Sequence, residues 1–174
     1  MYSFVLFKEA TEYFIRQEND MKARMLLLTV ALCFAGTALS FAQSPQMGTW
    51  KLDEAKSKIP AGVVKNSTVI YAADGDNVKV TTDGTDKDGK PLHTEWTGKF
   101  DGKDYPLTGD SSADSRSYKQ IDEHTLDLTN KKSGKVTTTG HVVIAANGKT
   151  RTLHLSGTDS SGKKVSSVSL YDKQ

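Results

Sequence analysis

The chain contains one segment that repeats in outline. Residues 67–98 reappear at 140–171, with 68–75 aligned on 141–148 and a second turn segment following at the same spacing in both copies. Each copy reads as strand, tight turn, strand, tight turn, strand. The repeat therefore predicts an all-β, antiparallel structure with an internal duplication.

Turn signals divide the rest of the chain in the same way. Pairs such as Asp74-Gly75 and Asp101-Gly102 arrive at intervals of about ten residues, and the runs between them are rich in Val, Thr, Leu and aromatic residues. Helical periodicity is absent. This even spacing predicts an up-and-down β-barrel of about nine or ten strands, with a strongly curved sandwich as the alternative.

Two turns fix the pairing of their flanking strands. Asn147-Gly148 is typical of a type I′ hairpin, in which both central residues have positive φ, and it places Val142 opposite Leu153. The loop 87–89 suits a three-residue connection with its glycine left-handed, which places Val80 opposite Trp96.

Strand alternation then separates inward from outward side chains. Many inward positions are Thr, Ser or Gly, which fits either a narrow, filled barrel or a solvated cavity lined by small polar residues. The larger inward residues are predicted to be Trp50, Leu52, Val69, Tyr71, Val78, Val80, Trp96, Phe100, Tyr105, Leu107, Leu126, Leu128, Val142, Ile144, Leu153 and Leu155.

The N-terminal region is predicted to lie outside the fold. Residues 21–42 combine a short basic segment, an apolar run and the small-x-small pattern that signal peptidase accepts, so we expect a signal peptide cleaved between Ala42 and Gln43. Residues 1–20 carry four acids and precede this segment, which indicates a misassigned start, with a true extension as the alternative. A single domain over 43–174 is then expected in the periplasm or outside the cell.

Composition excludes several classes of function. The 23 Lys+Arg and 21 Asp+Glu residues alternate in sign without long blocks, so neither nucleic acid nor a membrane is an expected partner of the mature chain. No nucleophile motif is present, and Cys33, the single cysteine, lies in the predicted leader. The sequence thus favours a non-catalytic protein without a cofactor, monomeric or weakly dimeric.

Two histidines are predicted to face each other across a hairpin. The pairing set by Asn147-Gly148 places His141 opposite His154 as a close, non-hydrogen-bonded pair. Two such imidazoles could share a Zn²⁺ or Cu²⁺ ion. Because no Cys, Asp or Glu nearby in the sequence completes a ligand set, an exposed pair on the polar face is the favoured interpretation.

The start of the predicted domain resembles the Gly-x-Trp signature of lipocalins and related barrels. The resemblance, to a group of small exported bacterial lipocalin-like proteins, covers 48–174 and implies a β-barrel in which Trp50 plugs the closed end against a basic side chain of the last strand. Since no arginine follows Arg151, Lys173 would take that place. The resemblance rests on the strings at 48–58, 100–106 and 171–173.

Two functions follow from this interpretation. The first is binding of a small apolar or amphipathic ligand inside the barrel, with Trp96, Phe100, Tyr105 and Tyr118 as the candidate lining. The alternative is an envelope structural, stress or interaction protein whose barrel is filled by its own side chains. A cavity lined by apolar residues would favour the first function, and a filled interior the second.

Overall fold

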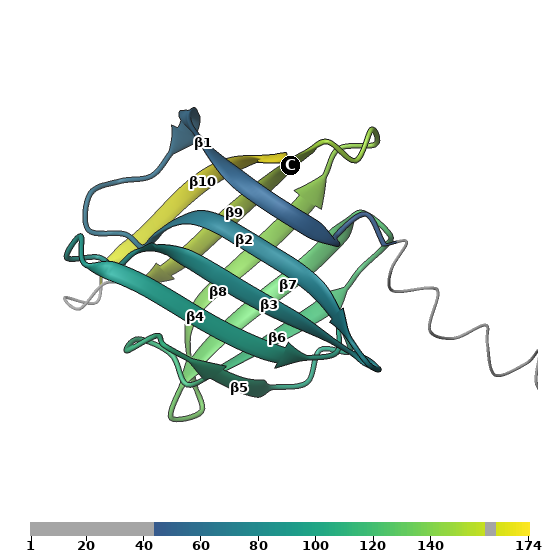
Figure 1. Cartoon of the computed structure of the whole chain (residues 1–174). Helices are drawn as coiled ribbons and strands as arrows, with labels where there is room; N and C mark the ends of the chain where they lie inside the picture. The colour runs from purple at the N-terminus through teal and green to yellow at the C-terminus, as the bar shows by residue number, and fades with distance from the viewer. Residues whose placement is uncertain (1–43, 159–162) are drawn as a thin grey trace, which may run out of the picture. The chain divides into compact units, whose positions relative to one another are not determined.

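The computed structural model describes residues 44–158 and 163–174. The predicted early start at 1–20 and the predicted signal peptide at 21–42 lie outside these residues. The described part of the chain contains ten β-strands and no helix (Figure 1). The strands are β1 (Gly48–Lys58), β2 (Lys65–Asp74), β3 (Asn77–Thr85), β4 (Pro91–Gly98), β5 (Tyr105–Thr108), β6 (Ser115–Gln120), β7 (Thr125–Lys132), β8 (Lys135–Ile144), β9 (Thr150–Thr158) and β10 (Lys164–Lys173).

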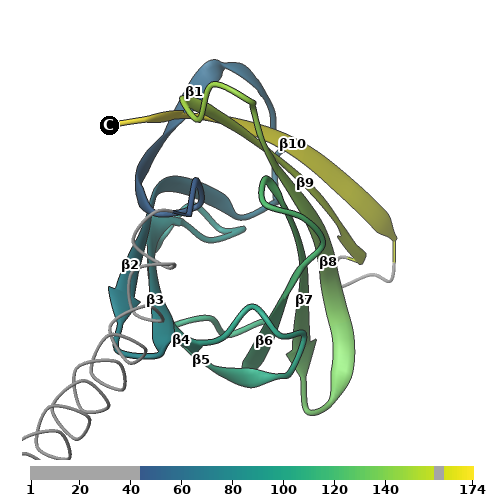
Figure 2. The same ribbon diagram turned by 90° about the vertical axis from the view of Figure 1, so that its right-hand side faces the viewer.

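The strands form one closed sheet. Each strand pairs antiparallel with the strand that follows it in the chain, and β1 closes the barrel by pairing with β10. Trp50 lies opposite Lys173 on β10 and opposite Val69 on β2. Figure 2 shows the strands following one another around a ring in chain order. The predicted antiparallel up-and-down β-barrel is confirmed, and it has ten strands.

The two copies of the repeat adopt the same arrangement. The first forms β2, β3 and β4 and the second forms β8, β9 and β10, each as a meander of three consecutive strands. The predicted pairings are confirmed in both, because Val80 lies opposite Trp96 and Val142 lies opposite Leu153. Gly89 has the predicted positive φ, at 79°.

The turn between β8 and β9 keeps the predicted pairing but differs in type. Gly148 has a φ of 68°, whereas Asn147 does not have the positive φ that a type I′ turn requires. The Gly148 N–H donates to the Ala145 carbonyl at 2.8 Å, and the Asn147 Oδ1 accepts from the Lys149 N–H at 2.9 Å. The predicted type I′ turn is therefore wrong, and the Asn147 side chain stabilises a longer loop.

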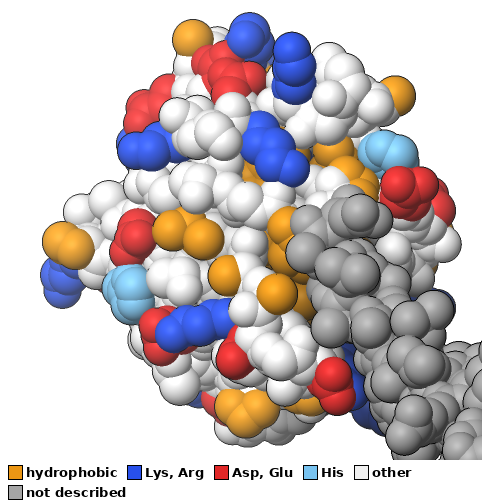
Figure 3. All heavy atoms as spheres, turned by 45° about the vertical axis from the view of Figure 1, so that its right-hand side comes forward, with side chains coloured by type: hydrophobic (Ala, Val, Ile, Leu, Met, Phe, Trp, Pro, Cys, Tyr) orange, Lys and Arg blue, Asp and Glu red, His pale blue; other side chains and the backbone are white. Residues whose placement is uncertain are grey.

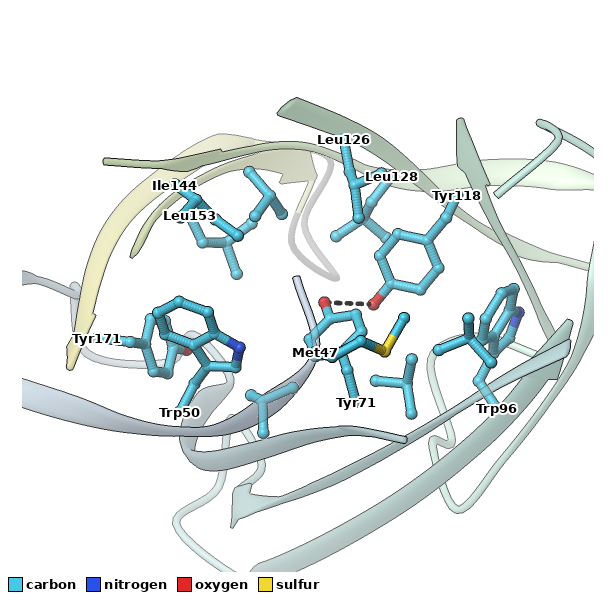
Figure 4. Packing of buried hydrophobic residues seen from close by; sticks show 14 of the residues in the cluster. Met47, Trp50, Tyr71, Trp96, Tyr118, Leu126, Leu128, Ile144, Leu153 and Tyr171 are labelled. Atoms are coloured by element: carbon cyan, nitrogen blue, oxygen red, sulfur yellow. Dashed lines mark hydrogen bonds between the residues drawn. The ribbon is translucent and has the colours of Figure 1, made fainter. Parts of the chain in front are cut away.

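The inward side chains form one hydrophobic core. Every residue on the predicted inward list is buried or packs against the buried cluster. Figure 4 shows Trp50 and Tyr171 close together at one end of this cluster and Trp96 at the other. The predicted alternation thus holds around the barrel. Four further apolar residues join the buried set, namely Met47, Ala113, Tyr118 and Tyr171.

The outer surface carries charges of both signs. On the face in Figure 3, Lys and Arg side chains lie among Asp and Glu side chains. Ion pairs join different strands and loops, for example Lys79 with Glu95 at 2.7 Å and Lys131 with Asp104 at 2.6 Å. Over residues 44–158 and 163–174, no helix has the length and apolar character needed to cross a membrane.

Two glycines with the same backbone conformation differ in the space around them. Gly109 has a φ of 84° and Gly89 one of 79°, but only at Gly109 would an added Cβ collide with a backbone carbonyl, that of His93. We expect Gly89→Ala to lower the free energy of unfolding by roughly 1–2 kcal/mol through backbone strain. Gly109→Ala should cost about 1–3 kcal/mol more through the collision. Urea unfolding measures both, and equal losses would contradict this assignment.

Candidate functional site

The barrel encloses a cavity of about 740 Å³. Inward side chains of the strands form its walls. The connections from each odd-numbered strand to the next strand form its rim, with adjoining strand ends. Lining residues on the rim include 61–64, Lys87, Asp110 and Val136. In an up-and-down barrel these connections all lie at one end. The barrel is therefore hollow towards the rim, which decides between the two interiors that the sequence left open.

Trp50 lies at the end of the barrel opposite the rim and is fully buried. Its Nε1–H donates to the Gln46 carbonyl at 3.0 Å. The Nζ of Lys173 lies 5.1 Å from the centre of the indole and donates to the Pro45 carbonyl at 3.1 Å. A cation is attracted to the face of an indole ring. A cation from the last strand therefore lies over the indole of Trp50.

Much of the cavity wall is apolar. Leu153 and Leu155 face inward along β9, with Val142 on the adjacent β8, Leu128 on β7 and Val69 on β2. Removing apolar groups from water is worth about 0.8 kcal/mol for each CH₂. These side chains therefore favour an occupant that is apolar over much of its length.

A hydrogen-bonded row of polar side chains also lines the cavity. The Nε of buried Arg116 donates to the Asn130 Oδ1 at 2.7 Å, and its Nη1 donates to the Tyr118 hydroxyl at 3.4 Å. The Tyr71 hydroxyl donates to the same Tyr118 oxygen at 3.4 Å, as the dashed line in Figure 4 shows. This row gives the cavity a few fixed polar groups that could orient a ligand.

Arg151 lies on the cavity wall at the start of β9, towards the plugged end of the barrel, and is 2% exposed. The guanidinium carbon lies 5.4 Å from the ring centre of Trp50, 5.2 Å from that of Tyr71 and 4.6 Å from that of Tyr171. Its Nε and Nη1 atoms have no hydrogen-bond partner among the residues that the structure describes. The deep end of the cavity thus holds a positive charge with unsatisfied donors.

Two buried tyrosines beside this charge stay protonated. Burial raises the pKa of the Tyr71 phenol far above its ordinary value, the neighbouring Tyr118 raises it further, and the Arg151 and Arg116 charges oppose the shift. Burial likewise raises the pKa of Tyr171, against the opposing effect of Arg151. Both phenols are therefore neutral hydroxyl groups at physiological pH.

The four predicted lining residues lie together, but only one is on the cavity wall. Tyr118 lines the cavity, whereas Trp96, Phe100 and Tyr105 do not. Trp96 stands edge-on to Tyr118 at 4.9 Å and to Tyr105 at 5.7 Å, and it stacks with Phe100 at 6.4 Å between ring centres. The three rings form one packed cluster with Tyr118 and do not border the cavity.

The two predicted facing histidines are cross-strand partners on the outer surface. His141 lies opposite His154, as predicted, and both are exposed. An acid from the adjacent β7 lies beside the pair, with the Asp127 Oδ1 2.7 Å from the His141 Nδ1. A second exposed pair, His93 with Asp83 at 2.6 Å, raises the pKa of His93 mainly through this hydrogen bond. Within the described ranges, no three His, Cys, Asp or Glu residues are grouped to hold a metal ion.

The buried arginines of the cavity were absent from the predicted site. Their signal was in the strand alternation, since Arg151 is two residues before the inward Leu153, and Arg116 is two residues before Tyr118. Residues of the same parity on a strand face the same side. Applying that rule to charged residues as well as apolar ones would have placed both guanidiniums inside the barrel.

These features define an antiparallel ten-stranded β-barrel that is plugged at one end and contains a cavity towards the other. No protein-family model and no curated protein matches the chain. Among solved structures, the chain is similar to a redesigned β-barrel, mFAP1, in a structure bound to DFHBI, with 16% identity and a TM-score of 0.38. That alignment covers 75% of this chain and 99% of the other.

Because Tyr71 is buried, the barrel should lose stability as the pH becomes alkaline. Because its folded pKa is raised, its contribution is fully present below the unfolded pKa of about 10 and is lost as pH rises beyond it. We expect the free energy of unfolding to fall between about pH 9 and pH 11. Tyr71→Phe should show a shallower fall over this range in urea unfolding, and slopes identical to the wild type would contradict the assignment.

Proposed function

We propose that this chain is an exported, lipocalin-like protein that binds a small apolar or amphipathic molecule inside its barrel without catalysing a reaction. The observation that carries the proposal is the cavity of about 740 Å³, with apolar walls and a few polar side chains. Its volume falls within the range of about 300–1,000 Å³ that is typical of small-molecule sites.

The closed end of the barrel supports the lipocalin-like assignment. Trp50 lies two residues after Gly48, which begins β1. It is fully buried and packs beneath the Lys173 cation from the last strand. We propose that the chain belongs to the group of small exported bacterial lipocalin-like proteins. This proposal is supported by the arrangement around Trp50 and by the sequence strings that resemble that group. We propose a periplasmic or secreted location on the basis of the signal peptide that the sequence predicts at 21–42.

The ionisable groups around the cavity support binding rather than catalysis. The acids among the lining residues, Asp88 and Asp110, lie on the rim loops. Arg116 and Arg151 carry guanidinium groups, which offer hydrogen-bond donors and no acceptor. No histidine is among the residues that line the cavity. The inner wall therefore lacks the carboxylates and imidazoles that most often serve in general acid–base catalysis.

A bulky side chain on the cavity wall should block binding. Thr94 is buried on β4 and lines the cavity, whereas Thr97 on the same strand faces outward and is exposed. With the neutral probe N-phenyl-1-naphthylamine, we expect fluorescence enhancement for the wild type. Thr94→Phe should weaken binding at least about tenfold, which corresponds to about 1.4 kcal/mol.

The matched variant Thr97→Phe adds the same ring outside the barrel and should bind the probe as the wild type does. Circular dichroism and thermal unfolding establish that both variants are folded. Equal affinities for all three proteins would show that the probe does not enter the cavity, and the proposal would then fail.

Native mass spectrometry of the protein from its own host's periplasm tests the remaining parts. The denatured mass should correspond to a chain that begins at Gln43. Native spectra should carry an excess mass that denaturation removes and that is not a metal. A bare native mass, even after incubation with the host's lipid extract, would contradict the ligand-binding function.

A further inference from the structure

The Arg151 side chain is a buried cation without an anionic partner. Its guanidinium is 2% exposed and forms no ion pair with any carboxylate among the residues that the structure describes. An uncompensated buried charge costs several kcal/mol. Strongly perturbed or costly charges cluster at functional sites, and here the charge lines the cavity of the barrel.

The surrounding aromatic rings satisfy this cation only in part. The rings of Trp50, Tyr71 and Tyr171 lie 4.6–5.4 Å from the guanidinium carbon, and their faces attract the positive charge. Ring faces do not replace an in-plane acceptor, and the Nε and Nη1 donors have none. Buried polar atoms usually have partners, so these two donors of Arg151 point to an absent acceptor.

A second guanidinium extends the positive character of the same cavity. Arg116 is 9% exposed, and its hydrogen bonds go to the neutral Asn130 and Tyr118 rather than to a carboxylate. Its charge is therefore hydrogen-bonded but not neutralised. Two buried positive charges inside one low-dielectric cavity favour an occupant that carries negative charge.

The apolar groups are arranged along a path that leads from Arg151 to the rim. Along β9 the inward positions are Arg151, then Leu153, then Leu155, as the strand runs from the plugged end to the rim. At the rim itself the lining includes Val136 and Val165. This order places a charged contact at the deep end and apolar contacts along the way out.

From this arrangement we infer that the cavity binds an amphiphile with an anionic oxygen head group, a carboxylate or a phosphate, which lies deep in the barrel against Arg151 with its apolar tail directed along β9 towards the rim. The inference rests on the proposed ligand-binding function and specifies the class of ligand. Arg116 adds to the positive potential of the site. The head group would accept hydrogen bonds from the Nε and Nη1 donors of Arg151.

Four amphiphiles of equal chain length test the head-group preference. Displacement of N-phenyl-1-naphthylamine is measured with laurate, dodecyl phosphate, 1-dodecanol and dodecyltrimethylammonium. We expect laurate or dodecyl phosphate to bind at least about tenfold more tightly than 1-dodecanol, since hydrogen bonds to charged groups are worth more than neutral ones. The cationic compound should bind more weakly than the alcohol. The tighter of the two anions identifies the head-group class.

Two variants that each remove one positive charge locate the preference. Arg151→Gln should abolish it, leaving laurate, dodecyl phosphate and 1-dodecanol within about twofold of one another. Lys173→Gln is the matched control, because Lys173 contacts Trp50 and the Pro45 carbonyl and does not line the cavity. It should keep the wild-type preference. If Arg151→Gln does not fold, the wild-type head-group series decides the question alone.

The outcomes distinguish a failure of this inference from a failure of the proposed ligand-binding function. If neither the neutral probe nor any dodecyl compound binds, the proposed function itself fails. If 1-dodecanol binds as tightly as both anions, the barrel is a ligand-binding protein but the anionic head group is refuted. If Lys173→Gln loses the preference as completely as Arg151→Gln, overall charge rather than the Arg151 contact is responsible, and the assignment of the head-group site is overturned.

Discussion

The pairing of β1 with β10 is the constraint on which the rest of the structure depends. It converts a linear meander into a closed sheet, so that the backbone donors and acceptors of the first and last strands satisfy each other. Closure also gives every strand residue a definite inner or outer position. At the seam, Trp50 lies opposite Lys173, and the plug of the barrel is therefore built by the same contact that closes it.

The two ends of the barrel have different interiors for a physical reason. Near the plugged end, large aromatic side chains such as Trp50 and Tyr171 fill the space between the walls. Towards the rim, inward positions are occupied by smaller residues such as Thr82 and Thr94, which leave volume between opposite walls. A ten-stranded closed sheet is wide enough that side chains of this size do not meet. The cavity follows from where large and small inward residues lie along the strands.

Much of the fold could be predicted from the sequence because hairpin pairing and alternation are local properties. The positions of Val80 opposite Trp96 and of Val142 opposite Leu153 follow from loop length alone. The cavity could not be predicted, because its volume depends on barrel width and on contacts across the interior. The three rings at Trp96, Phe100 and Tyr105 illustrate this: inward orientation placed them inside the barrel, but only packing decides whether a ring fills space or borders it.

If the anionic ligand that we infer binds at Arg151, the stability of the folded chain depends on the supply of that ligand. An empty barrel retains the cost of an uncompensated buried cation, whereas a bound anion removes it and adds its own binding free energy to the native state. The melting temperature of such a protein is then set partly by the ligand concentration around it. In a compartment without the ligand, the population of unfolded chains would rise, and proteases would remove the empty barrel before the occupied one.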